Sequence, residues 1–282
     1  MISSHRTSRR VGRTLTYVIL ILCAIICILP FLWMINTSFK TTAEAYTYPP
    51  TLIPRKWMFK NYPNGLAKAD FLTFAKNTVF LAVVCTAGTV LSAQFVAYGF
   101  ARFKARFSGA LYSLMLATLM LPAQVTLLPQ YLLYFKMHMI DTYWPLIIPA
   151  WLGGGTFNIF LFIQFFKSMP RELDEAATID GANPFQTFGY IMMPSIKSVS
   201  LCVLVMALVY NWNDFYMPLI YLNSTKKFTI AIGLQFLNSS MGDTKIGQMM
   251  AVAVVTMVPV LIIFFLCQKY FIEGIKMSGL KG

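Results

Sequence analysis

The chain contains few residues of the types that catalysis requires, and they do not have the spacing of a known catalytic motif. Its two histidines, His5 and His138, stand far apart, in settings where surface histidines are commoner than ligands or bases. The five cysteines all lie inside apolar runs and form no metal or redox motif. No G-x-S-x-G or H-E-x-x-H motif occurs. We therefore expect a protein that is not an enzyme.

The sequence also lacks the phosphate-binding loop of P-loop ATPases. A glycine triplet at 153–155 is followed by Thr156 and Phe157, with no lysine to reach a phosphate. No paired carboxylates occur inside the apolar runs, so proton-coupled transport lacks its usual groups as well. We expect this chain to bind no cofactor, and any energy that its function needs must come from another protein.

Five polar side chains inside apolar runs are the remaining candidates for binding chemistry. They are Gln124, Gln130, Asn211, Asn213 and Asp214. Polar groups within a membrane are costly, and amides and carboxylates offer hydrogen-bond donors or acceptors to a polar solute. Polar contacts between helices are the simpler alternative. Both interpretations, a lined pathway and helix contacts, remain open.

The elements that must position these residues are those of a membrane protein. Of the 282 residues, 57% are hydrophobic and only 12% are charged, whereas soluble domains average about 25% charged. The net charge of +13 comes from residues spread among short loops, which indicates membrane topology rather than nucleic-acid binding. The sequence predicts an integral membrane protein.

Six apolar runs predict six transmembrane helices, at about 15–36, 77–100, 111–134, 144–166, 199–222 and 246–267. Arginines before the first run, and the cluster Arg102, Lys104 and Arg106, place the N-terminus (1–14) and the turn after the second run in the cytoplasm. The C-terminal tail (268–282) is then cytoplasmic too. Residues 37–76 and 223–245 become external loops.

The last five runs, over residues 77–267, form the predicted helical core. Pro122 and Pro129 predict a broken backbone in the third run. The fold class that follows is an all-α, multi-pass membrane protein.

Residues 168–194 form the only densely charged block between two long apolar runs. Pro170 suits the first turn of a helix, and Gly181 suits its end. The acids near the predicted helix N-terminus, where the dipole favours anions, are Glu172, Asp174 and Glu175. Asn183 and Gln186 then have the spacing of a capping box. The block is predicted to fold as helix, tight turn and helix.

One face of the first predicted helix is small and shallow, and acids flank it. Its residues fall at i, i+3, i+4 and i+7, and they are Leu173, Ala176, Ala177 and Asp180. Such a face suits docking into a groove on another protein. A solvated cytoplasmic loop helix is the alternative interpretation.

The same block resembles the EAA signature of ABC importer permeases. The matching residues are Glu175-Ala176-Ala177, Asp180-Gly181-Ala182, Ile191 and Pro194. Further likeness extends over nearly the whole chain, at Leu121-Pro122-Ala123-Gln124-Val125, Leu128-Pro129, Trp212-Asn213 and the tail Gly279–Gly282. Together these resemble the smaller, six-span subunit of the maltose-type sugar permeases. The resemblance implies the type I ABC importer permease fold in a prokaryotic plasma (inner) membrane.

In that family the signature forms a coupling helix that docks on an ATPase. The resemblance assigns this role to Glu175, Ala176, Ala177, Asp180 and Gly181. It implies a second, different permease as heterodimer partner and two copies of an ATPase subunit, which carry the ATP and Mg²⁺. It also implies an external sugar-binding protein. The polar residues of the apolar runs would then hydrogen-bond sugar hydroxyls.

The resemblance also assigns roles to one external loop and to the C-terminal tail. The external loop 223–245 would contact the binding protein, and the tail 274–282 would reach between the ATPases. The alternative function is an autonomous, gradient-driven secondary transporter or channel in which Asp214 and the broken spans form the site.

Overall fold

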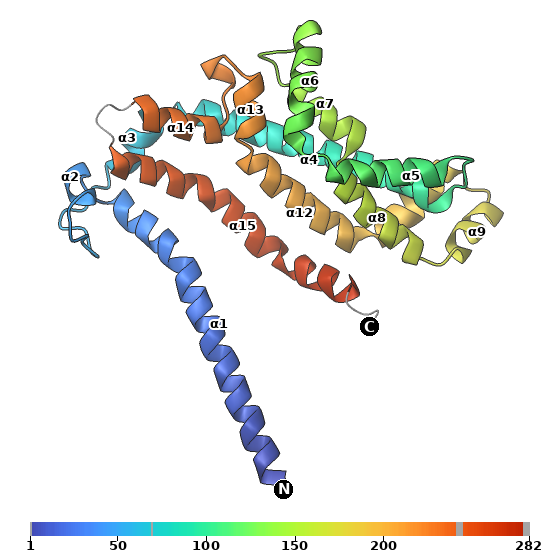
Figure 1. The fold of residues 1–282 in the computed structure, drawn as a ribbon, viewed down its shortest axis with the longest axis horizontal. Helices are drawn as coiled ribbons and strands as arrows, with labels where there is room; N and C mark the ends of the chain where they lie inside the picture. Colours follow the sequence, from blue (N-terminus) through green and yellow to red (C-terminus); the bar gives the residue numbers. More distant parts are fainter. Residues whose placement is uncertain (1, 69, 241–244, 279–282) are drawn as a thin grey trace. The chain divides into compact units, whose positions relative to one another are not determined.

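The structure, a computed structural model, describes residues 2–68, 70–240 and 245–278, and these fold as helices joined by turns (Figure 1). The chain divides into two compact units. The first consists of residues 1–70 and 234–257, and the second of residues 71–233 and 258–282. Helix α14 (Ile230–Ser240) begins in the second unit and ends in the first, whereas α15 (Ile246–Ser278) does the reverse.

The first unit begins with one long, apolar helix. Helix α1 (Ile2–Ser38) contains a stretch from Gly12 to Ser38 with a mean hydropathy of 3.1 and no buried residues in its most apolar window. The predicted external loop after it contains two short helices, α2 (Thr42–Ala45) and α3 (Asn61–Lys68). A helix that is apolar all round and unburied within its own chain suits contact with lipid.

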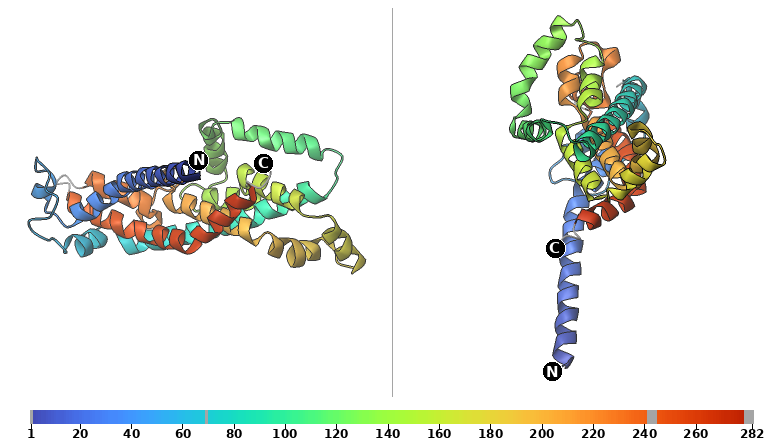
Figure 2. Two further views of the ribbon diagram at one scale, coloured as in Figure 1. Left: turned by 90° about the horizontal axis from the view of Figure 1, so that it is seen from below. Right: turned by 90° about the vertical axis from the view of Figure 1, so that its right-hand side faces the viewer.

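The second unit is arranged around α4 (Phe71–Arg102), which packs against α7 (Trp144–Gly153), α8 (Thr156–Ser168) and α12 (Lys197–Asn213). Figure 2 shows these helices side by side in two further views. The remaining elements of the unit, in chain order, are α5 (Ser108–Ala117), η1 (Thr118–Met120), α6 (Ala123–Lys136), α9 (Glu172–Ile179), α10 (Pro184–Gln186), η2 (Thr187–Met192), α11 (Met193–Ser195), α13 (Tyr216–Tyr221) and η3 (Thr225–Lys227).

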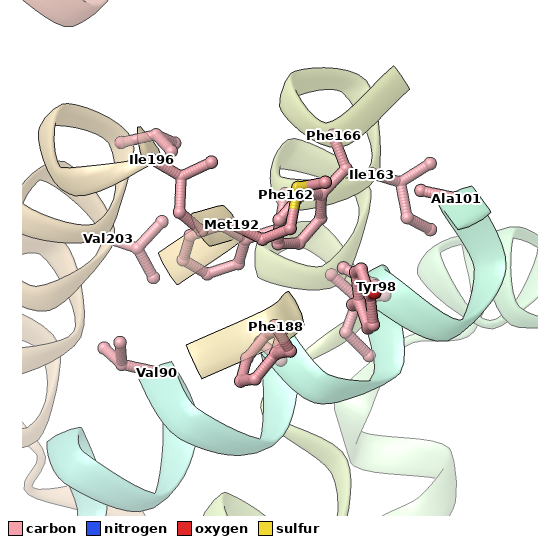
Figure 3. Packing of buried hydrophobic residues seen from close by; sticks show 14 residues of the cluster. Val90, Tyr98, Ala101, Phe162, Ile163, Phe166, Phe188, Met192, Ile196 and Val203 are labelled. Atoms are coloured by element: carbon pink, nitrogen blue, oxygen red, sulfur yellow. The ribbon is translucent and has the colours of Figure 1, made fainter. Parts of the chain in front are cut away.

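Small residues on α4 allow the other helices to approach closely. Ala93 and Ala97 are fully buried, and the core around them includes Phe162, Phe166 and Met192 (Figure 3). Between α7 and α8, Gly154 has a φ of +58°, and a Cβ at this position would lie 2.6 Å from the backbone nitrogen of Ala93. Only glycine fits this turn, because any side chain would collide with α4.

Within the part of the chain that the structure describes, four helical stretches are long and apolar enough to cross a membrane. They are Gly12–Ser38, Phe71–Arg102, Trp144–Ser168 and Ile246–Gln268, and they match four of the predicted runs. Two further candidates are bent pairs, Ser108–Met120 with Ala123–Lys136 at 102°, and Pro184–Ser195 with Lys197–Asn213 at 81°. Counting each pair as one span gives six. The predicted break in the third run is confirmed at Pro122.

The fifth predicted run, 199–222, is corrected by the structure. Helix α12 ends at Asn213, and Asp214 takes an extended ψ of 114°. The Asp214 carboxylate accepts a hydrogen bond from the backbone N–H of Met217, 3.3 Å away, at the start of α13. A short acidic side chain competes in this way with the helix's own hydrogen bonds. The predicted loop 223–245 contains η3, and most of its other described residues belong to α14.

Candidate functional site

Residues 168–194 fold in the predicted order, but α9 begins at Glu172 rather than at Pro170, and the second helix is the single turn α10 continued by the π-helix η2. Helix α9 is followed by Gly181 with a φ of +79°, a conformation that residues with a Cβ disfavour. Asn183 and Gln186 then exchange two hydrogen bonds of 2.8 and 2.9 Å, which complete the capping box at the start of α10. The predicted helix, tight turn and helix are confirmed, and they hold the segment in one defined shape.

An ion pair fastens this segment to the central helix of the second unit. Arg102, the last residue of α4, places its Nε 3.2 Å from Asp174 Oδ2 on α9. Its two terminal nitrogens each donate to the backbone oxygen of Met169 over 3.3 Å. The Arg102 side chain is only 5% exposed. The sequence pattern gave both residues other roles, Arg102 in topology and Asp174 at a helix dipole, so sequence reasoning missed the pair.

The outward side of the segment differs in part from the predicted docking face. Four predicted residues are exposed, namely Glu175, Ala176, Asp180 and Gly181. Ala177 is only 2% exposed. The assignment of Ala177 to an accessible face is corrected, because α9 turns this side chain toward the rest of the second unit, where η2 packs against the helix.

Three large apolar side chains project from the same segment into open space. Ile179 is 86% exposed, Phe185 is 78% exposed and Tyr190 is 82% exposed. Sequence reasoning missed them, although large apolar residues within a densely charged block could have indicated a contact surface. Exposed apolar groups of this size, rimmed by acids, are typical of protein–protein contact sites.

A second candidate site is a cavity of about 550 Å³ inside the second unit. The cavity is partly open, and residues of α4, α6, α7–α8 and α12–α13 line it, including three predicted pathway residues, Gln130, Asn211 and Asp214. Other polar lining groups are Thr89, Asn158 and Tyr210. The Asn211 amide also donates to Thr86 Oγ1 over 3.1 Å, which links α12 to α4. Asn211 therefore makes a helix contact and lines the cavity.

The other two predicted pathway residues lie elsewhere. The Asn213 amide donates to the backbone oxygen of Val209 in its own helix over 2.8 Å, and the side chain is exposed. Gln124 is exposed near the start of α6. Neither lines the cavity, so the structure brings together three of the five residues.

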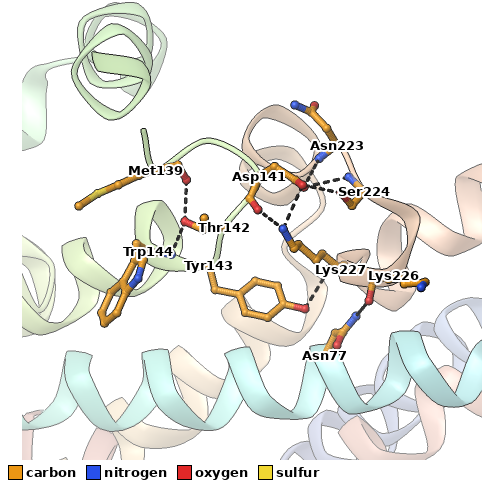
Figure 4. A network of polar contacts seen from close by, with 10 residues as sticks. All are labelled: Asn77, Met139, Asp141, Thr142, Tyr143, Trp144, Asn223, Ser224, Lys226 and Lys227. Atoms are coloured by element: carbon orange, nitrogen blue, oxygen red, sulfur yellow. Dashed lines mark hydrogen bonds and ion pairs between the residues drawn. The ribbon is translucent and has the colours of Figure 1, made fainter. Parts of the chain in front are cut away.

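A network around Asp141 fixes the predicted external loop after α13 (Figure 4). The Asp141 carboxylate accepts from the backbone N–H groups of Asn223 and Ser224, each over 2.9 Å, and from the Ser224 hydroxyl. It also pairs with Lys227 Nζ at 3.0 Å. Asn77 on α4 donates to the backbone oxygens of residues 226 and 228. We call residues 141 and 223–228 the external clasp.

The external clasp shifts the protonation of its central acid. Hydrogen bonds from the Ser224 hydroxyl, then from the backbone N–H groups of Ser224 and Asn223 and from Lys227, hold the pKa of Asp141 well below its ordinary value. Partial desolvation opposes this shift without cancelling it. The sequence pattern predicted only a brief turn here.

Comparison with known proteins identifies the chain. Residues 90–277 match the family described as "Binding-protein-dependent transport system inner membrane component". This chain belongs to that family. It is therefore a permease component of an ABC transporter, a non-catalytic, multi-pass subunit of the inner membrane.

Several permeases of this family are similar to it over nearly their whole length. The lactose transport system permease protein of Rhizobium radiobacter is 30% identical over 94% of this chain and 96% of that protein. The arabinooligosaccharides transport system permease protein of Bacillus subtilis is 30% identical over 97% of this chain and 96% of that protein. A binding-protein-dependent permease implies an ATPase and a binding protein as partners.

The fold of this permease matches a solved one. A chain from the crystal structure of a bacterial ABC transporter involved in the import of the acidic polysaccharide alginate superposes with a TM-score of 0.83. The match covers 94% of this permease and 98% of that chain, at 21% sequence identity. The predicted fold class, an ABC importer permease, is confirmed.

The Arg102–Asp174 pair generates a stability prediction. Neither contacting atom has a hydrogen-bond partner elsewhere among the described residues, so removing one charge leaves the other uncompensated. We expect Arg102→Met to lower the free energy of unfolding by about 1.5–3 kcal/mol. Thermal unfolding of the purified permease in detergent, in a double-mutant cycle with Asp174→Asn, measures this.

The matched control for this cycle is Lys104→Met, which removes an exposed cation two residues away. This variant should unfold like the natural permease. Strictly additive effects of Arg102→Met and Asp174→Asn would contradict the pairing.

The external clasp generates a pH prediction. Because the pKa of Asp141 is lower in the folded state, its carboxylate contributes stability that is fully present above about pH 4. This contribution is lost as the pH falls further toward the folded-state pKa. Asp141→Asn should therefore lower the free energy of unfolding at neutral pH by about 1 kcal/mol, and the unfolding temperature should fall with it. This difference from the natural permease should shrink in acid.

Asn223→Ala is the control for the external clasp. Asn223 bonds to Asp141 through its backbone N–H, which the substitution keeps. Its unfolding temperature should follow the natural permease across the pH range. A difference for Asp141→Asn that stayed constant down to about pH 3 would contradict the linkage.

Proposed function

We propose that this chain is one of two different permease subunits of an ABC importer that takes up a sugar or oligosaccharide. The names of its relatives support the substrate class, since they include permeases for lactose, arabinooligosaccharides and diacetylchitobiose. The two permeases form the translocation pathway as a heterodimer. Two copies of an ATPase subunit, which carry ATP and Mg²⁺, drive it by alternating access.

The observation that carries this proposal is the surface of residues 168–194. Ile179, Phe185 and Tyr190 are apolar anchors for a groove on the ATPase, and each contributes about 1.5–3 kcal/mol when buried. Glu175 and Asp180 stand exposed beside them and pair with basic groups of the ATPase at the rim of the contact. The anchors fix affinity, and the acids fix orientation.

The segment can transmit motion because it is fastened to the permease core. The Arg102–Asp174 pair and the Arg102 contacts to Met169 join α9 to the end of α4. A displacement of the ATPase groove therefore moves α4, on which α7, α8 and α12 pack. Gly181, with a φ of +79°, provides the turn between α9 and α10, the helix that contains Phe185.

The cavity of the second unit is the proposed sugar pathway on this subunit. Its lining is mostly apolar, and Gln130, Asn211 and Asp214 together offer both donors and acceptors to sugar hydroxyls. The external clasp holds residues 223–228 in place for contact with the external sugar-binding protein. In this proposal both termini lie in the cytoplasm. Of the tail, residues 279–282 lie outside the described residues.

The ATPase contact is tested with a double variant, Ile179→Ser with Phe185→Ser. Each loss of apolar burial is expected to weaken the contact by about tenfold or more. The variant permease should reach the membrane in normal amount, copurify with little ATPase and drive little sugar import. Copurification from detergent extracts and import by proteoliposomes measure the two effects.

The matched control for the ATPase contact is Ile179→Leu with Phe185→Leu, which keeps the apolar surface and should keep both activities. Undiminished copurification and import by the serine variant would contradict the proposed role. Import by the permease reconstituted without partners or ATP would favour a gradient-driven transporter instead.

The pathway is tested by two neighbouring asparagines. Asn211 lines the cavity, whereas Asn213 lies outside the cavity lining and its amide donates to Val209 of its own helix. Asn211→Ala should raise the sugar concentration for half-maximal import by about three- to tenfold, the effect of one lost hydrogen bond. Asn213→Ala should leave it unchanged. Equal effects of the two substitutions on import would contradict this pathway.

A further inference from the structure

The segment from Tyr46 to Lys60, in the first unit, combines exposed apolar side chains with exposed cations. The apolar set is Tyr46, Tyr48, Leu52, Ile53, Trp57 and Phe59, each more than half exposed. The exposed cations are Arg55, Lys56 and Lys60. No acid occurs between residues 46 and 60. We call residues 46–60 the aromatic–basic segment, and the function proposed above gives it no role.

Hydrogen bonds fold the aromatic–basic segment back onto the end of α1 (Figure 1). The Asn36 amide donates to the backbone oxygen of Leu52, and Lys40 Nζ donates to that of Thr51. The backbone N–H of Met58 donates to the oxygen of Phe39 over 2.8 Å. These bonds keep the segment within reach of the last turn of α1.

Aromatic rings strengthen the same attachment. The Phe39 ring lies 5.4 Å from that of Trp57 and 5.3 Å from that of Phe59, distances typical of favourable ring pairs. Lys40 Nζ lies 4.8 Å from the centre of the Trp33 ring on α1. The segment is therefore an ordered structure attached to a helix end.

The position of that helix end along the bilayer follows from length. The apolar run of α1 ends where Asn36, Thr37 and Ser38 begin. At 1.5 Å per residue, the run from residue 15 to residue 36 is about 33 Å long, close to the roughly 30 Å hydrocarbon core. Asn36 thus marks the border with the lipid headgroups, and whatever is bonded to it lies at the same depth.

The chemistry of the exposed groups matches that depth. Trp and Tyr concentrate at membrane interfaces, and cations beside them attract anionic phospholipid headgroups. The acid that directly precedes the segment, Glu44, is buried and accepts hydrogen bonds from Arg55 N–H at 2.8 Å and the Thr51 hydroxyl at 3.0 Å. Its charge is used within the protein, so the exposed surface is apolar and positive.

We propose that the aromatic–basic segment lies on the bilayer surface and binds anionic phospholipid, with its apolar side chains inserted among the headgroups and Arg55, Lys56 and Lys60 on the phosphates. It anchors the end of α1 at a fixed depth and limits rotation of that helix. The inference requires only that α1 spans the membrane, so it stands or falls independently of the sugar and the ATPase.

The test uses the full-length permease with Trp57 as its single tryptophan, after Trp33, Trp144, Trp151 and Trp212 are replaced by Phe. In phosphatidylglycerol vesicles, lipids brominated near the headgroup should quench Trp57 emission more than lipids brominated near the chain end. Aqueous iodide should quench it little. Replacing Arg55, Lys56 and Lys60 with Gln should abolish the preference for phosphatidylglycerol over phosphatidylcholine.

A second variant keeps the proposal testable if the single-tryptophan chain does not fold. Ile53→Cys, in a chain that keeps its tryptophans but has its five native cysteines replaced by Ala, should react with a charged, water-soluble maleimide about tenfold more slowly in vesicles than in detergent, which corresponds to about 1.4 kcal/mol of burial free energy. Asn64→Cys, an exposed polar position on α3, is the matched control and should react at similar rates in both.

Strong iodide quenching of Trp57 without lipid quenching would overturn the proposal, as would equal labelling of Ile53→Cys in vesicles and detergent. Protection that appears only when the binding protein or the second permease is added would also overturn it, because the segment would then be a protein contact.

Discussion

Close packing on α4 is the constraint on which the second unit depends. Three helices meet this one helix, and they can do so because Ala93 and Ala97 present no bulk and Gly154 carries no side chain where the α7–α8 turn reaches it. In a membrane, helices gain little from leaving lipid for one another, so close approach of backbones and van der Waals contact supply much of the stability. Small residues at the crossing points provide that approach.

The polar groups at the two ends of this packed core are joined to it by charge-assisted contacts. At one end, Arg102 connects α4 to α9 through Asp174. At the other, Asp141 collects backbone and side-chain donors from residues 223–227, while Asn77 holds the same stretch to α4. Such contacts are stronger than neutral hydrogen bonds, and they orient the segments that we propose contact other proteins. The core and these two proposed contact surfaces thus form one connected structure.

This connection gives a physical account of how a permease without catalytic groups can do work. A partner that binds residues 168–194 would act on apolar side chains whose position is fixed relative to α4, and the same helix lines the cavity. Binding energy at one surface can therefore be converted into rearrangement around the cavity, since packed helices shift between discrete arrangements rather than deform. The Asn211 bond to Thr86 lies on this route between α12 and α4.

The sequence by itself determined the helices, breaks and turns that depend on residues close together in the chain. Apolar length predicted the spans, Pro122 predicted the break in the third run, and Gly181 with the Asn183 and Gln186 capping pair predicted the turn of the charged block. These signals depend on the backbone preferences of nearby residues.

Only the tertiary structure decided which side chains meet across the chain and which face outward. It paired Arg102 with Asp174, gathered Gln130, Asn211 and Asp214 without Asn213, buried Ala177 and left Ile179 and Phe185 exposed. Contacts between residues far apart in sequence depend on how helices cross. A helix crossing is set by the summed packing of many small surfaces, and no local pattern contains that sum.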